Sequence, residues 1–257
     1  MLKFITAICT VFLCSGAAHA QTTAQSGGQV APQQVASTAK KISGTAHKSK
    51  SKKRSVKVAE IPDRPSLGDM QGLQFTLDPL ALKSNAALVI DQENSQVLFE
   101  KNAGVSLPIA SITKLMTSLV VLEANQDMDE ILEVTSADID TEKGSSSRLR
   151  IGSKLKRSDM LHIALMSSEN RAASSLGRNY PGGLQACVAA MNAKALSLGM
   201  MDTHYVDSTG LNSHNVASAQ DLAKLVGAAY NQTLIRQYST DTKYSVHPGG
   251  RALDYFS

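Results

Sequence analysis

The chain has 257 residues, 42% of them hydrophobic and 19% charged, so it is long enough for one or two domains with an ordinary core and is not disordered throughout. Aromatic residues make up only 4% and Trp is absent, which argues against a base-stacking surface. The net charge of +4 is uneven: residues 21–72 carry nine Lys or Arg against three Asp or Glu, whereas residues 73–257 carry sixteen against nineteen. A mildly acidic globular part therefore follows a basic leader, and we expect no nucleic-acid partner.

The first twenty residues have the layout of a secretory signal peptide. Lys3 supplies a positive start, residues 4–13 are apolar, and Ala18-His19-Ala20 is a small-x-small cleavage site. The apolar run is too short to span a bilayer, and no later segment is long and apolar enough to do so. Residues 1–20 are therefore predicted to be a signal peptide for export to the periplasm, with a retained N-terminal anchor as the alternative.

A basic, low-complexity stretch follows the signal peptide. Residues 21–66 are rich in Gln, Ala, Ser, Thr and Lys, and residues 48–54 are all Lys, Ser or Arg. Because the stretch has few large apolar side chains, their burial cannot offset the entropy cost of ordering the chain. We expect residues 21–66 to be disordered, within a basic linker over residues 21–72 that acts as a solvated tether or contacts an anionic envelope polymer by charge.

Residues 73–257 are predicted to fold as one domain. Two short strands joined at residues 91–95 predict a hairpin. The expected strands are residues 86–90, 96–100, 132–134 and 243–247, and the expected helices are residues 112–122, 158–166, 170–177, 184–198 and 218–230. Ser158 with Asp159 and Ser218 with Asp221 are the expected helix caps. A hairpin followed mostly by helices and then by more strand predicts an α+β fold.

Neither cysteine nor histidine usage indicates a metal site. Cys9 and Cys14 leave with the signal peptide, so Cys187 remains alone in an apolar helical pattern and is expected to be a buried structural thiol. The histidines lack a spacing typical of metal ligands, and His162 is expected to fill the core or a groove.

The first chemical motif is Ser111-Ile112-Thr113-Lys114. At the start of a helix, residues three apart lie on one face, which brings the Lys114 amine within reach of the Ser111 hydroxyl. A Lys whose pKa is lowered by desolvation or nearby cations can take the proton of a Ser nucleophile. Alone, this short pattern favours the alternative of a capping Ser followed by an exposed Lys.

The second motif is Ser168-Glu169-Asn170, at a predicted helix–helix junction. A Ser hydroxyl there could relay a proton, and an Asn amide could hold a peptide carbonyl. The alternative is simple helix capping by Ser and Asn. Glu169 is expected to be a capping or solvated residue, not a catalytic acid.

These motifs resemble the penicillin-binding proteins and serine β-lactamases, and most closely the low-molecular-mass D-alanyl-D-alanine peptidases of the endopeptidase type. The resemblance covers roughly residues 86–245. It is carried by Ala110-Ser111-Ile112-Thr113-Lys114-Leu115-Met116-Thr117, Ser147-Arg148-Leu149, Leu165-Met166-Ser167-Ser168-Glu169-Asn170-Arg171-Ala172-Ala173 and Asp207-Ser208-Thr209-Gly210-Leu211-Asn212. Asn212 and Ser208, which flank the Thr-Gly-Leu turn, are interpreted as structural support near the cleft.

The resemblance implies a β-lactamase/transpeptidase-like fold, with an antiparallel sheet packed against a helical cluster, and serine acyl transfer without metal or cofactor. Ser111 would be the nucleophile, Lys114 the general base and Ser168 the proton relay. Asn170 would bind the substrate amide, and the Ser111 backbone N–H would be one oxyanion donor. The implied substrates are peptidoglycan stem peptides and cross-links, with β-lactams as covalent inhibitors.

The chain departs from the family pattern in one respect: no Lys-Thr-Gly or Lys-Ser-Gly follows Ser168. On this basis the domain is expected to be incomplete at its C-terminal side, without the final strands. The leading function is a D,D-endopeptidase acting on cross-links. The alternatives are a D-alanyl-D-alanine carboxypeptidase, an inactive homologue that only binds cell wall, and, more distantly, a β-lactamase.

Overall fold

The computed structural model describes residues 65–257. The predicted signal peptide and most of the predicted linker lie outside the described residues. The first elements are a short helix, α1 (Leu67–Met70), and a 3-10 turn, η1 (Leu73–Phe75). Ser66 caps α1 in a reciprocal pair with Asp69, an arrangement that stabilises even one turn. The sequence analysis did not predict α1 because four residues carry no periodic pattern.

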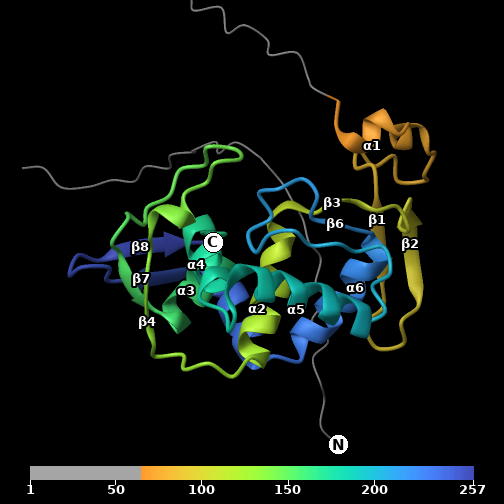
Figure 1. Ribbon diagram of the computed structural model, residues 1–257. Coiled ribbons are helices and arrows are strands. Elements are labelled where there is room, and N and C mark those ends of the chain that lie inside the picture. The colour runs from red at the N-terminus through yellow and green to blue at the C-terminus, as the bar shows by residue number, and fades with distance from the viewer. Residues whose placement is uncertain (1–64) are drawn as a thin grey trace, which may run out of the picture. The chain divides into compact units, whose positions relative to one another are not determined.

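The predicted hairpin is confirmed. Strands β1 (Ala87–Ile90) and β2 (Val97–Lys101) pair antiparallel, with an irregularity in register after Val89 (Figure 1). At the end of β2, the buried Lys101 Nζ lies 2.9 Å from Asp78 Oδ2 and donates to the Leu82 carbonyl oxygen at 2.8 Å. This buried ion pair fixes the segment before β1 against the hairpin.

The helices form the centre of the domain. They are α2 (Thr113–Glu123), α3 (Arg157–Met166), α4 (Asn170–Arg178), α5 (Gly183–Ser197), α6 (Ala219–Tyr230) and α7 (Thr233–Thr240). The first five match the predicted helices, whereas α7 was not predicted. Ser218 caps α6 by accepting from the Asp221 backbone N–H at 3.2 Å, as expected.

The predicted cap of α3 is wrong. The N-cap residue is Lys156, with no side-chain hydrogen bond, and Ser158 lies inside the first turn. The backbone N–H groups of Arg157 and Ser158 instead donate to the carbonyl oxygens of Glu130 and Met128, at 2.8 and 3.0 Å. Tertiary contacts therefore satisfy these N–H groups, so a capping side chain is not needed.

The remaining strands pair two by two. The antiparallel pairs are β3 (Leu107–Pro108) with β6 (Val216–Ala217), β4 (Ile131–Glu133) with β5 (Lys154–Lys156), and β7 (Lys243–Val246) with β8 (Leu253–Phe256). Two 3-10 turns, η2 (Ala110–Ile112) and η3 (Ser136–Asp138), complete the set. The α+β class is confirmed. Within residues 65–257 the strands form four two-stranded sheets, and not the single antiparallel sheet that was expected.

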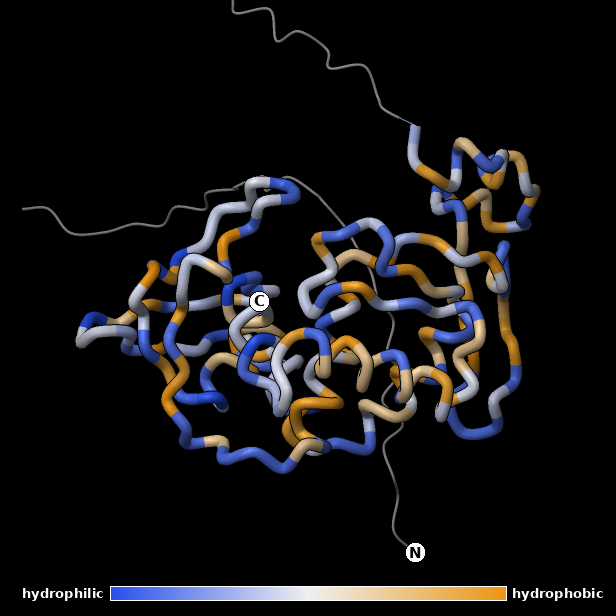
Figure 2. Tube along the Cα trace, in the orientation of Figure 1, coloured by the Kyte–Doolittle hydropathy of each residue, from blue (hydrophilic) through white to orange (hydrophobic). Residues whose placement is uncertain are grey.

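Helix α2 lies between two hydrophobic clusters. Val121 belongs to a cluster with the α3 residues Leu161 and Ile163, whereas Met116 and Leu119 belong to a second cluster that includes Met191 of α5. Apolar segments accordingly run through α2 in Figure 2. Burial on both sides gives α2 a fixed position, since core side chains pack at near-crystalline density.

Among residues 65–257, no helix combines the length and hydrophobicity needed to cross a membrane.

Candidate active site

The first predicted motif lies where η2 passes into α2. Ser111 is exposed in the 3-10 turn, and Lys114 is 2% exposed in the first turn of the helix. Lys114 Nζ donates to Ser111 Oγ at 3.1 Å. The three-residue spacing therefore places a buried amine directly beside an accessible hydroxyl, which is the geometry that a base needs to activate a nucleophile.

The Lys114 amine has three oxygen acceptors. Besides Ser111 Oγ, it donates to Asn170 Oδ1 at 2.8 Å and to the Thr209 carbonyl oxygen at 2.7 Å. These acceptors match the three N–H donors of an ammonium group. They come from three separate segments of the chain, so the position of the amine is fixed by the tertiary fold.

Burial lowers the pKa of Lys114 to about 8. Desolvation is the main cause, and the carboxylates of Asp207 and Glu169 act against it, whereas the positive charge of Lys143 acts with it. A Lys with this pKa is partly neutral at physiological pH. It can therefore accept a proton from Ser111, which a Lys in water would not do.

The second motif forms the junction of α3 and α4. Glu169 caps α4 by accepting from the Arg171 backbone N–H at 3.2 Å, so the expected capping role is confirmed. It is nevertheless buried, with 7% exposure, and not solvated. Its carboxylate accepts from the Ser147 hydroxyl at 2.7 Å and from the Tyr255 hydroxyl at 3.4 Å, which replaces the lost water.

Ser168 and Asn170 take different positions. Asn170 reaches Lys114, as described above, whereas the exposed Ser168 has a left-handed backbone with φ of 58°. Within the described part of the chain, no hydrogen bond joins the Ser168 side chain to Ser111 or Lys114. Ser168 instead lines a hollow with Ser146, Ser147, Arg148, Ser167, Glu169, Asn170 and Tyr255.

A turn at residues 207–212 supports the start of α2. The Asp207 carboxylate accepts from the backbone N–H groups of Thr209, Gly210 and Asn212 at 2.5, 2.6 and 2.9 Å. Gly210 has φ of 82°, and a Cβ atom at this position would lie 1.8 Å from the Ala110 carbonyl oxygen. The turn thus packs against the residue that precedes Ser111.

Side chains of the same region fasten the turn to its neighbours. Thr117 of α2 donates to the Ser208 carbonyl oxygen at 2.8 Å, and the Ser208 hydroxyl donates to the Ala173 carbonyl oxygen of α4 at 3.1 Å. Asn212 donates to Glu142 at 3.2 Å. The interpretation of Ser208 and Asn212 as structural support is confirmed by these contacts.

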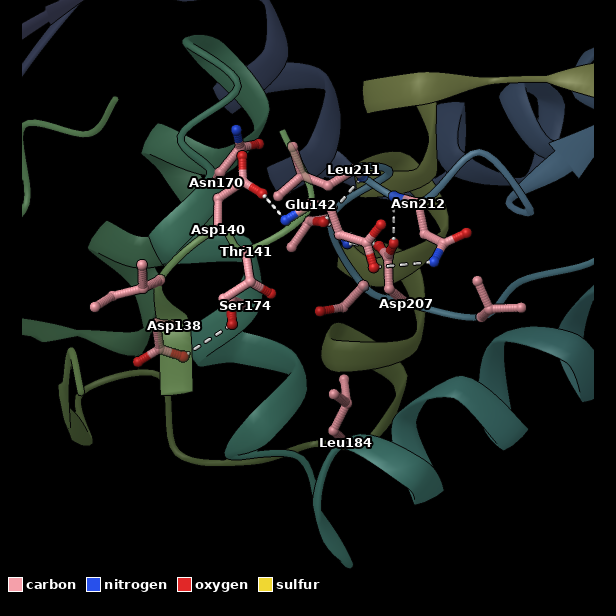
Figure 3. A pocket seen from close by; sticks show the side chains of 14 residues that line it. Asp138, Asp140, Thr141, Glu142, Asn170, Ser174, Leu184, Asp207, Leu211 and Asn212 are labelled. Atoms are coloured by element: carbon pink, nitrogen blue, oxygen red, sulfur yellow. Dashed lines mark hydrogen bonds between the residues drawn. The ribbon is translucent and has the colours of Figure 1, made fainter. Parts of the chain in front are cut away.

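A groove runs beside the Lys114 acceptors (Figure 3). It is lined by residues from four parts of the chain: Asp138, Ile139, Asp140, Thr141, Glu142, Asn170, Ser174, Leu184, Val206, Asp207, Ser208, Thr209, Leu211 and Asn212. Its carboxylates have partners within the protein. Asp138 pairs with Arg178 at 2.9 Å, and Glu142 accepts from Asn212. Among residues 65–257, no group of three His, Cys, Asp or Glu side chains is arranged to hold a metal ion.

Two residues judged structural from the sequence are buried in packed surroundings. His162 is stacked between Tyr238 and Tyr244, with ring centroids 4.1 and 3.7 Å away, and burial lowers its pKa. Cys187 is fully buried, which raises the pKa of its thiol to about 12. A thiol held protonated in this way is inert as a nucleophile.

The sequence analysis did not identify several residues that hold the site. Ser145 accepts from Asn170 Nδ2 at 2.9 Å, and the buried Asn215 donates to Thr113 Oγ1 at 3.0 Å. Both contacts join residues far apart in sequence, where no local pattern predicts them. The run of three serines at residues 145–147 was the available signal, because small polar side chains in a row are typical of a segment that hydrogen-bonds to its surroundings.

Comparison with known proteins agrees with this geometry. A D-alanyl-D-alanine endopeptidase of Pseudomonas aeruginosa is 50% identical over 170 residues, which are 65% of this chain and 55% of that protein. The D-alanyl-D-alanine endopeptidase of Escherichia coli is 48% identical over 180 residues, covering 70% and 58%. The chain thus spans little more than half the length of these curated relatives.

Solved structures share the fold. A mutant of the Streptomyces K15 DD-transpeptidase superposes with a TM-score of 0.62 at 22% identity, over 66% of this chain and 72% of that one. A D-alanyl-D-alanine carboxypeptidase from Mycobacterium tuberculosis superposes with a TM-score of 0.60 at 26% identity, over 66% and 65%. The expected transpeptidase-like fold is confirmed. The model of peptidase family S11, described as D-alanyl-D-alanine carboxypeptidase, matches residues 73–251, and the chain therefore belongs to this family.

Proposed function

We propose that this chain is a serine D,D-peptidase that cleaves D-alanyl bonds in peptidoglycan cross-links through an acyl-enzyme on Ser111. The observation that carries the proposal is the buried Lys114 amine, which donates to the exposed Ser111 hydroxyl and has a pKa of about 8. A base of this kind beside a Ser needs neither metal nor cofactor.

In the proposed acylation, neutral Lys114 takes the Ser111 proton as Oγ attacks the carbonyl carbon of a D-alanyl residue. The resulting oxyanion is held by the Ser111 backbone N–H. The C–N bond then breaks, and the proton that Lys114 took from Ser111 passes through Ser168 to the leaving amine. Ser168 lies two residues before Asn170, which accepts a hydrogen bond from Lys114, and this proximity supports the relay role.

In the proposed deacylation, Lys114 removes a proton from water, which attacks the ester and releases Ser111. Asn170 would orient the substrate amide with its side-chain N–H, while its Oδ1 accepts from Lys114. A β-lactam would form the same ester, but its leaving nitrogen stays tethered, so hydrolysis would be slow.

The endopeptidase reading rests on the two bacterial relatives that carry that name at about half identity. A carboxypeptidase that trims terminal D-alanine is the second candidate, because the family model and a Bacillus subtilis relative at 31% identity are described as carboxypeptidases. Export to the periplasm, with residues 1–20 as signal peptide and residues 21–72 as linker before the peptidase domain, is part of the same proposal.

Purified chain incubated with cross-linked and with uncross-linked muropeptides separates the candidates. An endopeptidase converts cross-linked dimers to monomers, whereas a carboxypeptidase releases free D-alanine from pentapeptide monomers. Ser111→Ala is the matched control for both products. Binding to sacculi without either product would favour the inactive, wall-binding alternative and would contradict the proposal.

A further inference from the structure

The segment that contains residues 140–147, named here the serine loop, is folded around one carboxylate. Asp140 accepts from the backbone N–H groups of Glu142, Lys143 and Ser145 at 2.8, 2.9 and 2.7 Å. Burial opposes ionisation, but these hydrogen bonds hold the pKa of Asp140 well below its usual range. The carboxylate therefore stays charged, and the loop has a defined shape although most of its side chains are exposed.

Two alternate serines of this loop dock onto the second motif. Ser145 Oγ accepts from Asn170 Nδ2 at 2.9 Å, and Ser147 Oγ donates to Glu169 at 2.7 Å. Ser146, between them, is exposed and makes no side-chain hydrogen bond within residues 65–257. The loop thus contacts the motif through Ser145 and Ser147, whereas Ser146 between them is exposed.

The contacts of Lys114 and Ser145 hold the two ends of the Asn170 amide in one orientation. A Lys ammonium only donates hydrogen bonds, so it needs the Oδ1 end. Lys114 Nζ donates to Asn170 Oδ1 at 2.8 Å, and Asn170 Nδ2 donates to Ser145 Oγ. Ser145, Asn170, Lys114 and Ser111 therefore form one continuous hydrogen-bonded chain.

We propose that Ser145 is a positioning residue, which locks the Asn170 amide with Oδ1 toward Lys114 and so holds the amine against Ser111. The inference deepens the proposed function and rests on it for its catalytic meaning. The hydrogen-bond chain itself is testable without any activity.

A positioning role for Ser145 predicts a change in the titration of Lys114, which a purely structural role does not predict. Asn170 Oδ1 favours the charged form of Lys114, and without Ser145 the amide loses the partner that holds its Nδ2 end, so its contact with Lys114 weakens. The titration midpoint of Lys114 should then fall by about 0.5 to 1 pH unit. The other charged groups that act on Lys114, namely Asp207, Glu169 and Lys143, are unchanged by this substitution.

The experiment follows the Lys114 ε-carbon by NMR in the full chain labelled with ¹³C-lysine, with Lys114→Arg to assign the signal. Ser145→Ala should lower the midpoint, and Ser146→Ala, the matched control on the same loop, should leave it unchanged. Thr keeps a hydroxyl at position 145, and Val has the same shape without it. Ser145→Thr should therefore match the unsubstituted chain, and Ser145→Val should match Ser145→Ala.

Equal midpoints for Ser145→Thr and Ser145→Val would overturn the inference, even if Ser145→Ala failed to fold. In a labelling assay with a fluorescent penicillin, Ser145→Ala should also acylate about 10-fold more slowly than Ser146→Ala, because a small misplacement of a catalytic group is costly. Absence of labelling in the unsubstituted chain would count against the proposed function alone, since the NMR comparison would still decide the role of Ser145.

Discussion

Lys114 Nζ donates to the carbonyl oxygen of Thr209 at 2.7 Å, although the two residues are 95 positions apart in the chain. A backbone carbonyl cannot move independently of its turn. The Asp207 carboxylate and Thr117 of α2 hold the turn at residues 207–212 in place. The base of the proposed reaction is therefore placed by the fold, and not by its own flexible side chain.

The pH dependence of acylation follows from the lowered pKa of Lys114. Because only the neutral amine accepts the Ser111 proton, the labelling rate with a fluorescent penicillin should rise with pH and level off above a midpoint of about 8. Rates measured from pH 6 to 10 on the full chain test this. A rate that is flat over this range would exclude Lys114 as the titrating base.

The lowered pKa of Lys114 also makes the free energy of unfolding depend on pH. An unfolded Lys binds its proton up to a pKa near 10.5, whereas folded Lys114 loses it at about 8, so the unfolded state binds more protons between these values. This residue should therefore make the free energy of unfolding rise with pH over that window. Urea titrations at pH 8 and 10 should show a smaller rise in Lys114→Met than in the unsubstituted chain.

Lys143 is expected to tune the base through charge. Its positive charge lowers the pKa of Lys114, so Lys143→Gln should raise the midpoint of the acylation profile above about 8. Lys154→Gln is the control, since Lys154 is exposed and pairs with Glu133 at 3.3 Å. A Lys143→Gln profile that coincides with the control would show that Lys143 has no such effect.

Gly210 is expected to be intolerant of any side chain. Gly210→Ala would combine a left-handed backbone with a Cβ atom 1.8 Å from the Ala110 carbonyl oxygen, so about 3 kcal/mol of stability should be lost. Gly249→Ala has a similar φ of 78° with no atom within 4 Å of the added Cβ, and should cost only about 1 kcal/mol. Urea unfolding of both variants measures the difference, and equal losses would contradict the packing of the turn against Ala110.

Arg157 and Lys156 offer a comparison of a buried and an exposed cation, each paired with an exposed carboxylate. The fully buried Arg157 pairs with Glu130 and donates to the Asp127 carbonyl oxygen, whereas Lys156 pairs with Asp129 at 52% exposure. Arg157→Ala should cost about 2–5 kcal/mol because it removes a fully buried side chain, and Lys156→Ala less than about 1 kcal/mol. Calorimetric melting measures the stability lost in each variant. Equal losses would contradict the buried position of Arg157.

Local patterns predicted the parts of the molecule that depend on local sequence. The hairpin at residues 91–95, the helix after Ser111 and the spacing of Ser111 to Lys114 all follow from turn residues and helical periodicity. Helix α7 and strand β8 were not predicted, because β8 exists only by pairing with β7, and α7 packs on α3 through the stacking of Tyr238 on His162.

The candidate site likewise contains residues that local sequence predicts and residues that it does not predict. Its motif residues carry recognisable patterns, but the partners that orient them do not. Thr209 acts through a backbone carbonyl, which any residue supplies, and Ser145 reaches Asn170 across 25 positions. Such contacts are fixed by tertiary packing, so they become visible only in the folded structure.

The central claim is that Lys114 activates Ser111 for acyl transfer. Incubation of the full chain with a penicillin, followed by digestion and peptide mass spectrometry, tests it most directly. The account predicts one adduct with the mass of the intact penicillin on Ser111, no adduct in Ser111→Ala, and formation at least about 100-fold slower in Lys114→Ala, as expected for loss of a general base. An adduct on a different residue, or one that forms as fast in Lys114→Ala as in the unsubstituted chain, would contradict the account.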